Sequence, residues 1–147
     1  MGAGRPAARD PFFPLDSEVL ISNSLGSVLH HVVIEVSSLE RSAAFYDALI
    51  APLGWRRQLN GGEAIGYGIG KPALLITERP RACNDGALIA LDAPGIAAVK
   101  AAWEAGCANG GRSVMAPGES TGHGSGSYSA YLCDPDGQEI EVTVGSD

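Results

Sequence analysis

The chain has few cysteines, few clustered basic residues and no long apolar run, and each scarcity excludes a class of protein. Its three cysteines, Cys83, Cys107 and Cys133, form no C-x-x-C pair, so we expect neither a zinc knuckle nor a disulfide framework, and we predict a reducing cytoplasm. Ten Lys and Arg stand against 17 Asp and Glu, a net charge of −7. Phosphate contacts need clustered positive charge, so neither nucleic acid nor an anionic membrane surface is a predicted partner. No apolar stretch approaches the roughly 18 residues that a membrane-spanning helix needs.

The composition that is present favours one globular domain rich in strands. The 147 residues are 45% hydrophobic and include 20 glycines, which imply many turns. We predict a partly flexible extension over residues 1–27, in which Val19, Leu20 and Ile21 form a candidate edge strand. A single domain is predicted over residues 28–147.

The predicted elements follow one another in the same order twice. Alternating and helical apolar patterns give strand, helix and three strands over residues 29–36, 37–50, 55–59, 63–69 and 72–77. The second set is 87–91, 94–105, 112–116, 127–133 and 139–144. Ser37 and Glu40 have the spacing of a capping box at the start of the first helix. The chain is therefore predicted to be two βαβββ modules, over about residues 28–81 and 85–145.

The first and last of these strands carry polar groups on one face only. Side chains alternate across a strand, so Val32, Ile34 and Val36 share a face and leave His31, Val33 and Glu35 on the other. In the last strand, Ile140, Val142 and Val144 oppose Glu139, Glu141 and Thr143. The apolar faces can pack on helices, and the opposite faces present imidazole and carboxylate, which are ligand types for divalent metals.

Three stretches of the sequence resemble the vicinal oxygen chelate superfamily, which includes glyoxalase I, bleomycin- and fosfomycin-resistance proteins and extradiol dioxygenases. They are His31-Val-Val-Ile-Glu-Val with the following Ser-Leu-Glu-Arg-Ser-Ala-Ala-Phe-Tyr46, Ala87-Leu-Ile-Ala-Leu, and Asp134-Pro-Asp-Gly-Gln-Glu-Ile-Glu141. The resemblance covers about residues 29–145. It implies an α+β fold in which the two modules form a cup-shaped mixed sheet with helices on its convex face.

The resemblance also implies a site in the cup and a departure from the family pattern. In metal-using members, ligands stand on the first strand of each module and on the last strand, positions that correspond here to His31, Leu88 and Glu141. Leu88 replaces a histidine and has no electron pair to donate. His31 and Glu141 remain the candidate metal ligands, with Mn, Fe, Zn or Ni, or no metal at all, as the implied cofactor.

Two functions are compatible with this pattern. One is a protein that binds a small organic molecule in the cup without a complete metal site. The alternative is a divalent-metal-dependent lyase, transferase or dioxygenase that uses His31, Glu141 and a replacement ligand. A homodimer is expected by resemblance.

The candidate site combines residues from the cup-facing strands and from one loop. Glu141 is the candidate catalytic residue, and His123 lies in a Gly/Ser-rich loop that could cover the cup. Tyr128 and Tyr131 fall on opposite faces of one strand, so at most one of them lines the cup. The predicted ligand-binding set is His31, Val33, Glu35, Leu88, Ala90, Tyr128, Glu139 and His123.

Overall fold

The computed structural model describes residues 29–80, 82, 84–120 and 126–145. The chain divides into a unit of residues 1–30 and a unit of residues 31–147. The second unit contains every helix and strand described below. The candidate strand at Val19–Ile21 and the loop residue His123 lie outside the described residues.

The first module forms a four-stranded sheet with one helix. Its elements are β1 (Val32–Val36), α2 (Leu39–Ile50), the short 3-10 helix η1 (Ala51–Leu53), β2 (Arg56–Gly61), β3 (Ala64–Ile69) and β4 (Lys71–Glu78). The strand order is β1-β4-β3-β2. Strand β1 runs parallel to β4, and the other neighbours are antiparallel. This parallel pair requires a crossover, which α2 and the β2–β3 hairpin provide.

The second module repeats this topology. Its elements are β5 (Leu88–Asp92), α3 (Ile96–Ala108), β6 (Arg112–Ser120), β7 (Ser127–Cys133) and β8 (Glu139–Val144). The order is β5-β8-β7-β6, again with a single parallel pair, β5 and β8. The predicted α+β fold of two βαβββ modules is confirmed, and its strands are hydrogen-bonded as two sheets of four.

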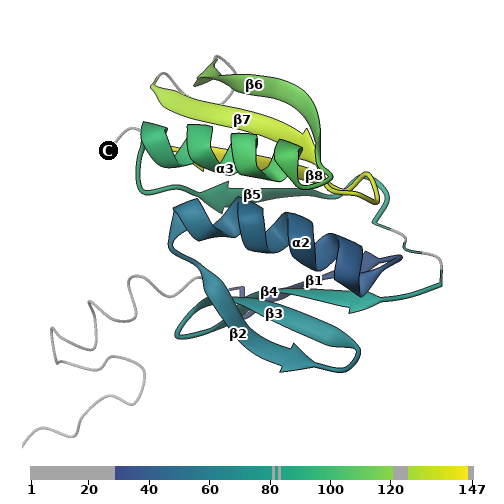
Figure 1. The fold of residues 1–147 in the computed structure, drawn as a ribbon. Helices are drawn as coiled ribbons and strands as arrows, with labels where there is room; N and C mark the ends of the chain where they lie inside the picture. The colour runs from purple at the N-terminus through teal and green to yellow at the C-terminus, as the bar shows by residue number, and fades with distance from the viewer. Residues whose placement is uncertain (1–28, 81, 83, 121–125, 146–147) are drawn as a thin grey trace, which may run out of the picture. The chain divides into compact units, whose positions relative to one another are not determined.

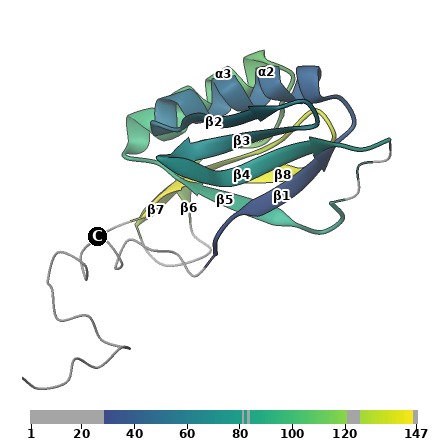
Figure 2. The same ribbon diagram turned by 90° about the horizontal axis from the view of Figure 1, so that it is seen from below.

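Both helices cover the same side of the molecule and contact each other (Figures 1 and 2). The alternation predicted for the outer strands sends Ile34, Val36, Ile140 and Val142 into the core, where each is at most 1% exposed. From α2 the core receives Phe45, Tyr46 and Leu49, and from α3 it receives Val99 and Ala102. On the opposite faces of β1 and β8, Val33 and Glu139 are exposed and Glu35 and Glu141 are half-buried. None of the helices in the described ranges is long and apolar enough to cross a membrane.

The start of α2 differs from the capping box predicted at Ser37. The N-cap is Ser38, whose hydroxyl accepts a hydrogen bond from the Arg41 backbone N–H at 3.3 Å. The carboxylate of Glu78, on β4, accepts from the Leu39 N–H at 2.7 Å. An anion at this end is stabilised by the helix dipole. Ser37 is left to bond elsewhere, and its partner comes from the second module.

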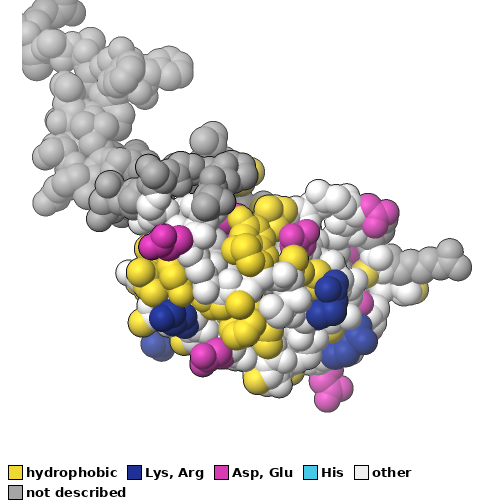
Figure 3. Space-filling model, turned by 90° about the horizontal axis from the view of Figure 1, so that it is seen from above, with side chains coloured by type: hydrophobic (Ala, Val, Ile, Leu, Met, Phe, Trp, Pro, Cys, Tyr) yellow, Lys and Arg dark blue, Asp and Glu magenta, His cyan; other side chains and the backbone are white. Residues whose placement is uncertain are grey.

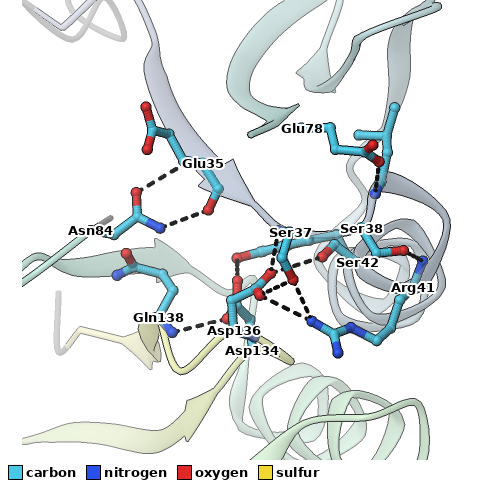
Figure 4. A network of polar contacts seen from close by, with 12 residues as sticks. Glu35, Ser37, Ser38, Arg41, Ser42, Glu78, Asn84, Asp134, Asp136 and Gln138 are labelled. Atoms are coloured by element: carbon cyan, nitrogen blue, oxygen red, sulfur yellow. Dashed lines mark hydrogen bonds and ion pairs between the residues drawn. The ribbon is translucent and has the colours of Figure 1, made fainter. Parts of the chain in front are cut away.

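The Asp-Pro-Asp-Gly turn between β7 and β8 binds the first module to the second (Figure 4). The Asp136 carboxylate accepts from the Ser37 N–H at 3.0 Å, from the Ser37 hydroxyl and from the Arg41 guanidinium at 3.0 Å. The buried Asp134 accepts from the Tyr46 hydroxyl at 2.7 Å, and from the backbone N–H groups of Asp136 and Gln138 within its own turn. The motif that carried the family resemblance thus joins the two modules.

Candidate functional site

On the face of the second sheet opposite the core, side chains of neighbouring strands lie in rows. Residues opposite each other in the β-ladder share a face. The central row is Ala90 on β5, Glu141 on β8, Tyr131 on β7 and Met115 on β6. The rows beside it are Leu88, Glu139, Cys133 and Arg112 on one side and Asp92, Thr143, Ser129 and Gly118 on the other. We call the side of the sheet that carries these rows the Glu141 face.

Glu141 and Tyr131 lie opposite each other on neighbouring strands in the central row of the Glu141 face. Both are half-buried. Burial raises the pKa of Tyr131, and the hydrogen bond to Glu141 and the negative charges of Glu141 and Glu139 raise it further. The phenol is therefore held in its neutral, donating form, and Glu141 is held as its acceptor. A carboxylate oriented by a phenol can accept a proton or a hydrogen bond from a bound ligand.

The two ends of the Glu141 face differ in exposure and chemistry. Leu88, Ala90 and Glu139 are exposed, and Leu88 is 49% exposed despite its apolar side chain. At the other end, the hydroxyls of Ser129 and Thr143 are hydrogen-bonded to each other at 2.7 Å, with Ser129 fully buried. The Glu141 face therefore carries both polar and apolar side chains. It is accessible to solvent at the Leu88 end.

The structure brings four of the predicted site residues together on this face. They are Leu88, Ala90, Glu139 and Glu141. Val33 and Glu35 belong to β1, in the other sheet, and share the outward face there with Leu75 and Thr77 of β4. Val33 is 50% exposed. The backbone N–H and carbonyl of Glu35 are both bonded to the Asn84 side chain, at 3.1 and 2.7 Å.

Tyr128, assigned to the ligand by the sequence, lies on the helix-facing side of its strand. It pairs with Val144 in the ladder and packs against the hydrophobic core, with the Lys100 ammonium 5.9 Å from the centre of its ring. Tyr131 takes the position beside Glu141 instead. The sequence holds a signal for this choice: counting back through the Asp-Pro-Asp-Gly turn pairs Glu139 with Cys133 and Glu141 with Tyr131.

Among the residues that the structure describes, the predicted donors do not come together as a complete metal site. His31 is exposed and stands just before β1 in the first sheet, whereas Glu141 lies in the second. Leu88 contributes no donor atom. Within the described ranges, no three His, Cys, Asp or Glu residues are placed to hold a metal ion. Three protein donors around one ion are the usual minimum for a catalytic site.

Comparisons with known proteins agree with the fold. The family model of the Glyoxalase/Bleomycin resistance protein/Dioxygenase superfamily matches residues 28–142. A glyoxalase/bleomycin resistance protein from Albidiferax ferrireducens T118 is 31% identical, with a TM-score of 0.71 over 82% of this chain and 100% of that one.

Two more distant structures share the fold. One is a glyoxalase/bleomycin resistance protein/dioxygenase family enzyme from Burkholderia phytofirmans PsJN, 19% identical with a TM-score of 0.64 over 82% of this chain and all of that one. The other is a glyoxalase-related enzyme from Fulvimarina pelagi, 21% identical with a TM-score of 0.63 over 82% of this chain and 89% of that one. A search of curated proteins finds no match. With its two modules and the residues matched, this chain belongs to the Glyoxalase/Bleomycin resistance protein/Dioxygenase superfamily.

Proposed function

We propose that this protein binds a small organic molecule on the Glu141 face without a complete metal site. The observation that carries the proposal is the row in which Glu141 stands between Ala90 and Tyr131, with exposed Leu88 in the next row. The carboxylate and the phenol supply orientation, and Leu88 and Ala90 supply apolar contact. Binding sites for small molecules combine apolar lining with a few placed polar groups in this way.

The proposal assigns a separate role to each of the central residues. Glu141 would accept a hydrogen bond from a hydroxyl, amine or thiol of the ligand, and Tyr131 would hold the carboxylate in place. Leu88 would contact the apolar part of the ligand at the position where metal-using relatives have a histidine. We further propose that the protein acts as a homodimer, because a second copy would enclose a face that is open in one chain.

Metal analysis of the purified protein separates this proposal from the metal-dependent alternative. We expect far less than one Mn, Fe, Ni or Zn per chain. One equivalent of any of these metals, lost when His31 and Glu141 are both replaced, would overturn the proposal and favour a lyase, transferase or dioxygenase.

Ligand binding itself is tested by a thermal-shift screen of small aromatic and thiol compounds in the presence of a chelator. A ligand at 100 times its Kd stabilises the folded state by about 2.7 kcal/mol, which is readily detected. We expect Glu141→Gln to abolish the shift of any hit, and Glu119→Gln, an exposed carboxylate on β6, to preserve it. A hit that shifts both variants equally would place its binding elsewhere and contradict the assignment of Glu141.

A further inference from the structure

Arg112 supplies a positive charge to the Glu141 face, close to its central row. It pairs with Cys133 in the β-ladder, and Cys133 pairs with Glu139, so Arg112 belongs to the row that begins at Leu88. Among the described residues of the three rows, Arg112 is the only Lys or Arg. The chain as a whole has a net charge of −7. A cation at this position therefore bears on which ligands the face accepts.

The Arg112 side chain lies across the Glu141 face. Its Nη2 group donates a hydrogen bond to the Sγ atom of Cys133 at 3.2 Å, and Cys133 is only 6% exposed. Cys133 is on β7, two residues after Tyr131, so the two side chains share a face. The guanidinium group is thereby held beside β7, in the row next to Tyr131 and Glu141.

Most N–H donors of this guanidinium group have no acceptor in the described part of the chain. An arginine side chain carries five N–H donors, and a thiol sulfur is a weak acceptor. Within the described ranges, Arg112 makes no ion pair and no side-chain hydrogen bond other than the one to Cys133. Arg41 and Arg57, in contrast, are each paired with a carboxylate. Arg112 is exposed, so an anionic group of a ligand can reach it.

Glu141 lies one diagonal step across the sheet from the position that the guanidinium group contacts. Cys133 on β7 pairs with Glu139 on β8, and Glu141 is two residues further along β8. Diagonal neighbours of this kind are about 7–8 Å apart. A ligand that lies along this diagonal meets a cation at one end and a carboxylate at the other, with Tyr131 next to Cys133 and opposite Glu141.

We propose that the ligand of the Glu141 face is a small organic acid that also carries an amine or hydroxyl group. Its carboxylate binds the Arg112 guanidinium, and its N–H or O–H group donates to Glu141. The inference rests on the binding function proposed above and adds the charge of the ligand and the separation of its two polar groups. Arg112 then selects acids over their neutral analogues, because a guanidinium group binds a carboxylate through two parallel charge-assisted hydrogen bonds.

Isothermal titration calorimetry at low salt with para-(aminomethyl)benzoate tests the proposal. A rigid ring separates the ammonium and the carboxylate of this compound, and para-(aminomethyl)benzamide is the matched analogue without the negative charge. We expect the wild type to bind the acid saturably and about ten-fold more tightly than the amide, a difference of about 1.4 kcal/mol.

Two arginine variants assign this preference. Arg112→Gln should weaken binding of the acid about ten-fold and change binding of the amide by less than about two-fold. Unchanged binding of the amide also shows that the variant is folded. Arg56→Gln, at an exposed arginine on β2 in the other sheet, is the control and should keep the preference for the acid.

Three results would overturn the proposal. They are no saturable binding of the acid, equal binding of acid and amide by the wild type, and an Arg112→Gln variant with the same preference as Arg56→Gln.

Glu141→Gln separates this inference from the function on which it rests. We expect this variant to weaken both compounds and to keep the preference for the acid. If Glu141→Gln weakens both and Arg112→Gln weakens neither, Glu141 retains its proposed role and the role of Arg112 is rejected. If Glu141→Gln leaves both unchanged, the acid does not span the two residues and the inference is rejected, whereas the role of Glu141 is then decided by the thermal-shift screen.

Discussion

At the scale of single residues, Asp136 stabilises a helix whose first residues lie almost a hundred positions earlier in the chain. It accepts hydrogen bonds from Ser37 and Arg41, 99 and 95 residues away. The Asp136 carboxylate therefore binds the residue before the N-cap of α2 and an arginine in its first turn. It joins the two modules in the same way. Nothing local in the Asp-Pro-Asp-Gly sequence specifies this role, because a turn of that composition is satisfied by its own backbone.

Replacing Asp136 should destabilise the whole fold. We expect Asp136→Ala to lower the free energy of unfolding by about 1.5–3 kcal/mol, since hydrogen bonds to charged groups contribute about that much and Ser37 is left without its acceptor. Urea unfolding followed by circular dichroism measures the change. Glu104→Ala, on the exposed side of α3, is the control and should change stability by less than about 0.5 kcal/mol. Equal stability of the two variants would refute a joining role for Asp136.

Asp134 gives a second prediction at this scale, in the dependence of stability on pH. Burial raises the pKa of its carboxyl group, and this outweighs the lowering by the Tyr46 hydroxyl and the N–H groups of Gln138 and Asp136. The folded state therefore binds this proton more tightly than the unfolded state, whose group keeps its ordinary value of 3.8. Protonation of Asp134 thus adds stability as the pH falls through the raised pKa toward that value.

Asp134→Asn removes this titration and leaves the other carboxylates unchanged. The difference in unfolding free energy, wild type minus variant, should therefore increase in favour of the wild type between about pH 7 and about pH 4.5. Parallel urea titrations at several pH values give the difference directly. A constant difference, or one that shrinks on acidification, would show that the pKa of Asp134 is not raised.

At the scale of elements, the contact between α2 and the end of α3 depends on residues without side chains. A Cβ atom built on Gly111 would stand 2.5 Å from Cε2 of Phe45 and 2.7 Å from the carbonyl oxygen of Gly106. Gly111 also donates its N–H to that carbonyl at 2.9 Å. The backbone cannot retreat without losing this bond, and Phe45 is fully buried. Gly111 thus sets how closely α2 approaches the segment that follows α3.

Gly111→Ala should consequently destabilise the protein by about 1–3 kcal/mol through overpacking. Gly62→Ala is the matched control, because a Cβ there meets nothing within 4 Å. It should be neutral or slightly stabilising, since alanine restricts the unfolded chain. Thermal unfolding of both variants against the wild type checks the pair. If Gly111→Ala unfolds at the same temperature as the wild type, the contact between α2 and the segment after α3 accommodates a methyl group without loss of stability.

At the scale of the whole molecule, apolar side chains remain on the surface of both sheets. Val33 and Leu88 are about half exposed on the edge strands β1 and β5, and Val114 and Met115 are 49% and 39% exposed on the edge strand β6. Figure 3, which views the molecule from the side on which β6 lies in Figure 1, shows hydrophobic side chains gathered between charged ones. Exposed apolar patches bordered by polar residues are typical of contact surfaces.

We therefore expect a homodimer in solution. Sedimentation equilibrium should give a mass near twice the 15.1 kDa of the chain, and Met115→Asp or Leu88→Asp should shift the equilibrium toward the monomer by placing a charge in the contact. The unfolding temperature of the wild type should also rise with protein concentration. A mass of one chain at all concentrations would contradict the dimer.

The sequence by itself determined the elements and their faces. The alternation in β1 and β8, the apolar spacing in α2 and the Asp-Pro-Asp-Gly turn are local patterns, and each acts over a few residues, so they specify strand, helix and turn wherever the chain goes. Only the tertiary structure decided that Asp134 and Asp136 bind α2 and the residue before its N-cap, and that residues 84–88 and 136–139 line one cavity. These arrangements depend on contacts between residues up to 99 positions apart, and such contacts follow from the packing of two modules against each other, which no local pattern encodes.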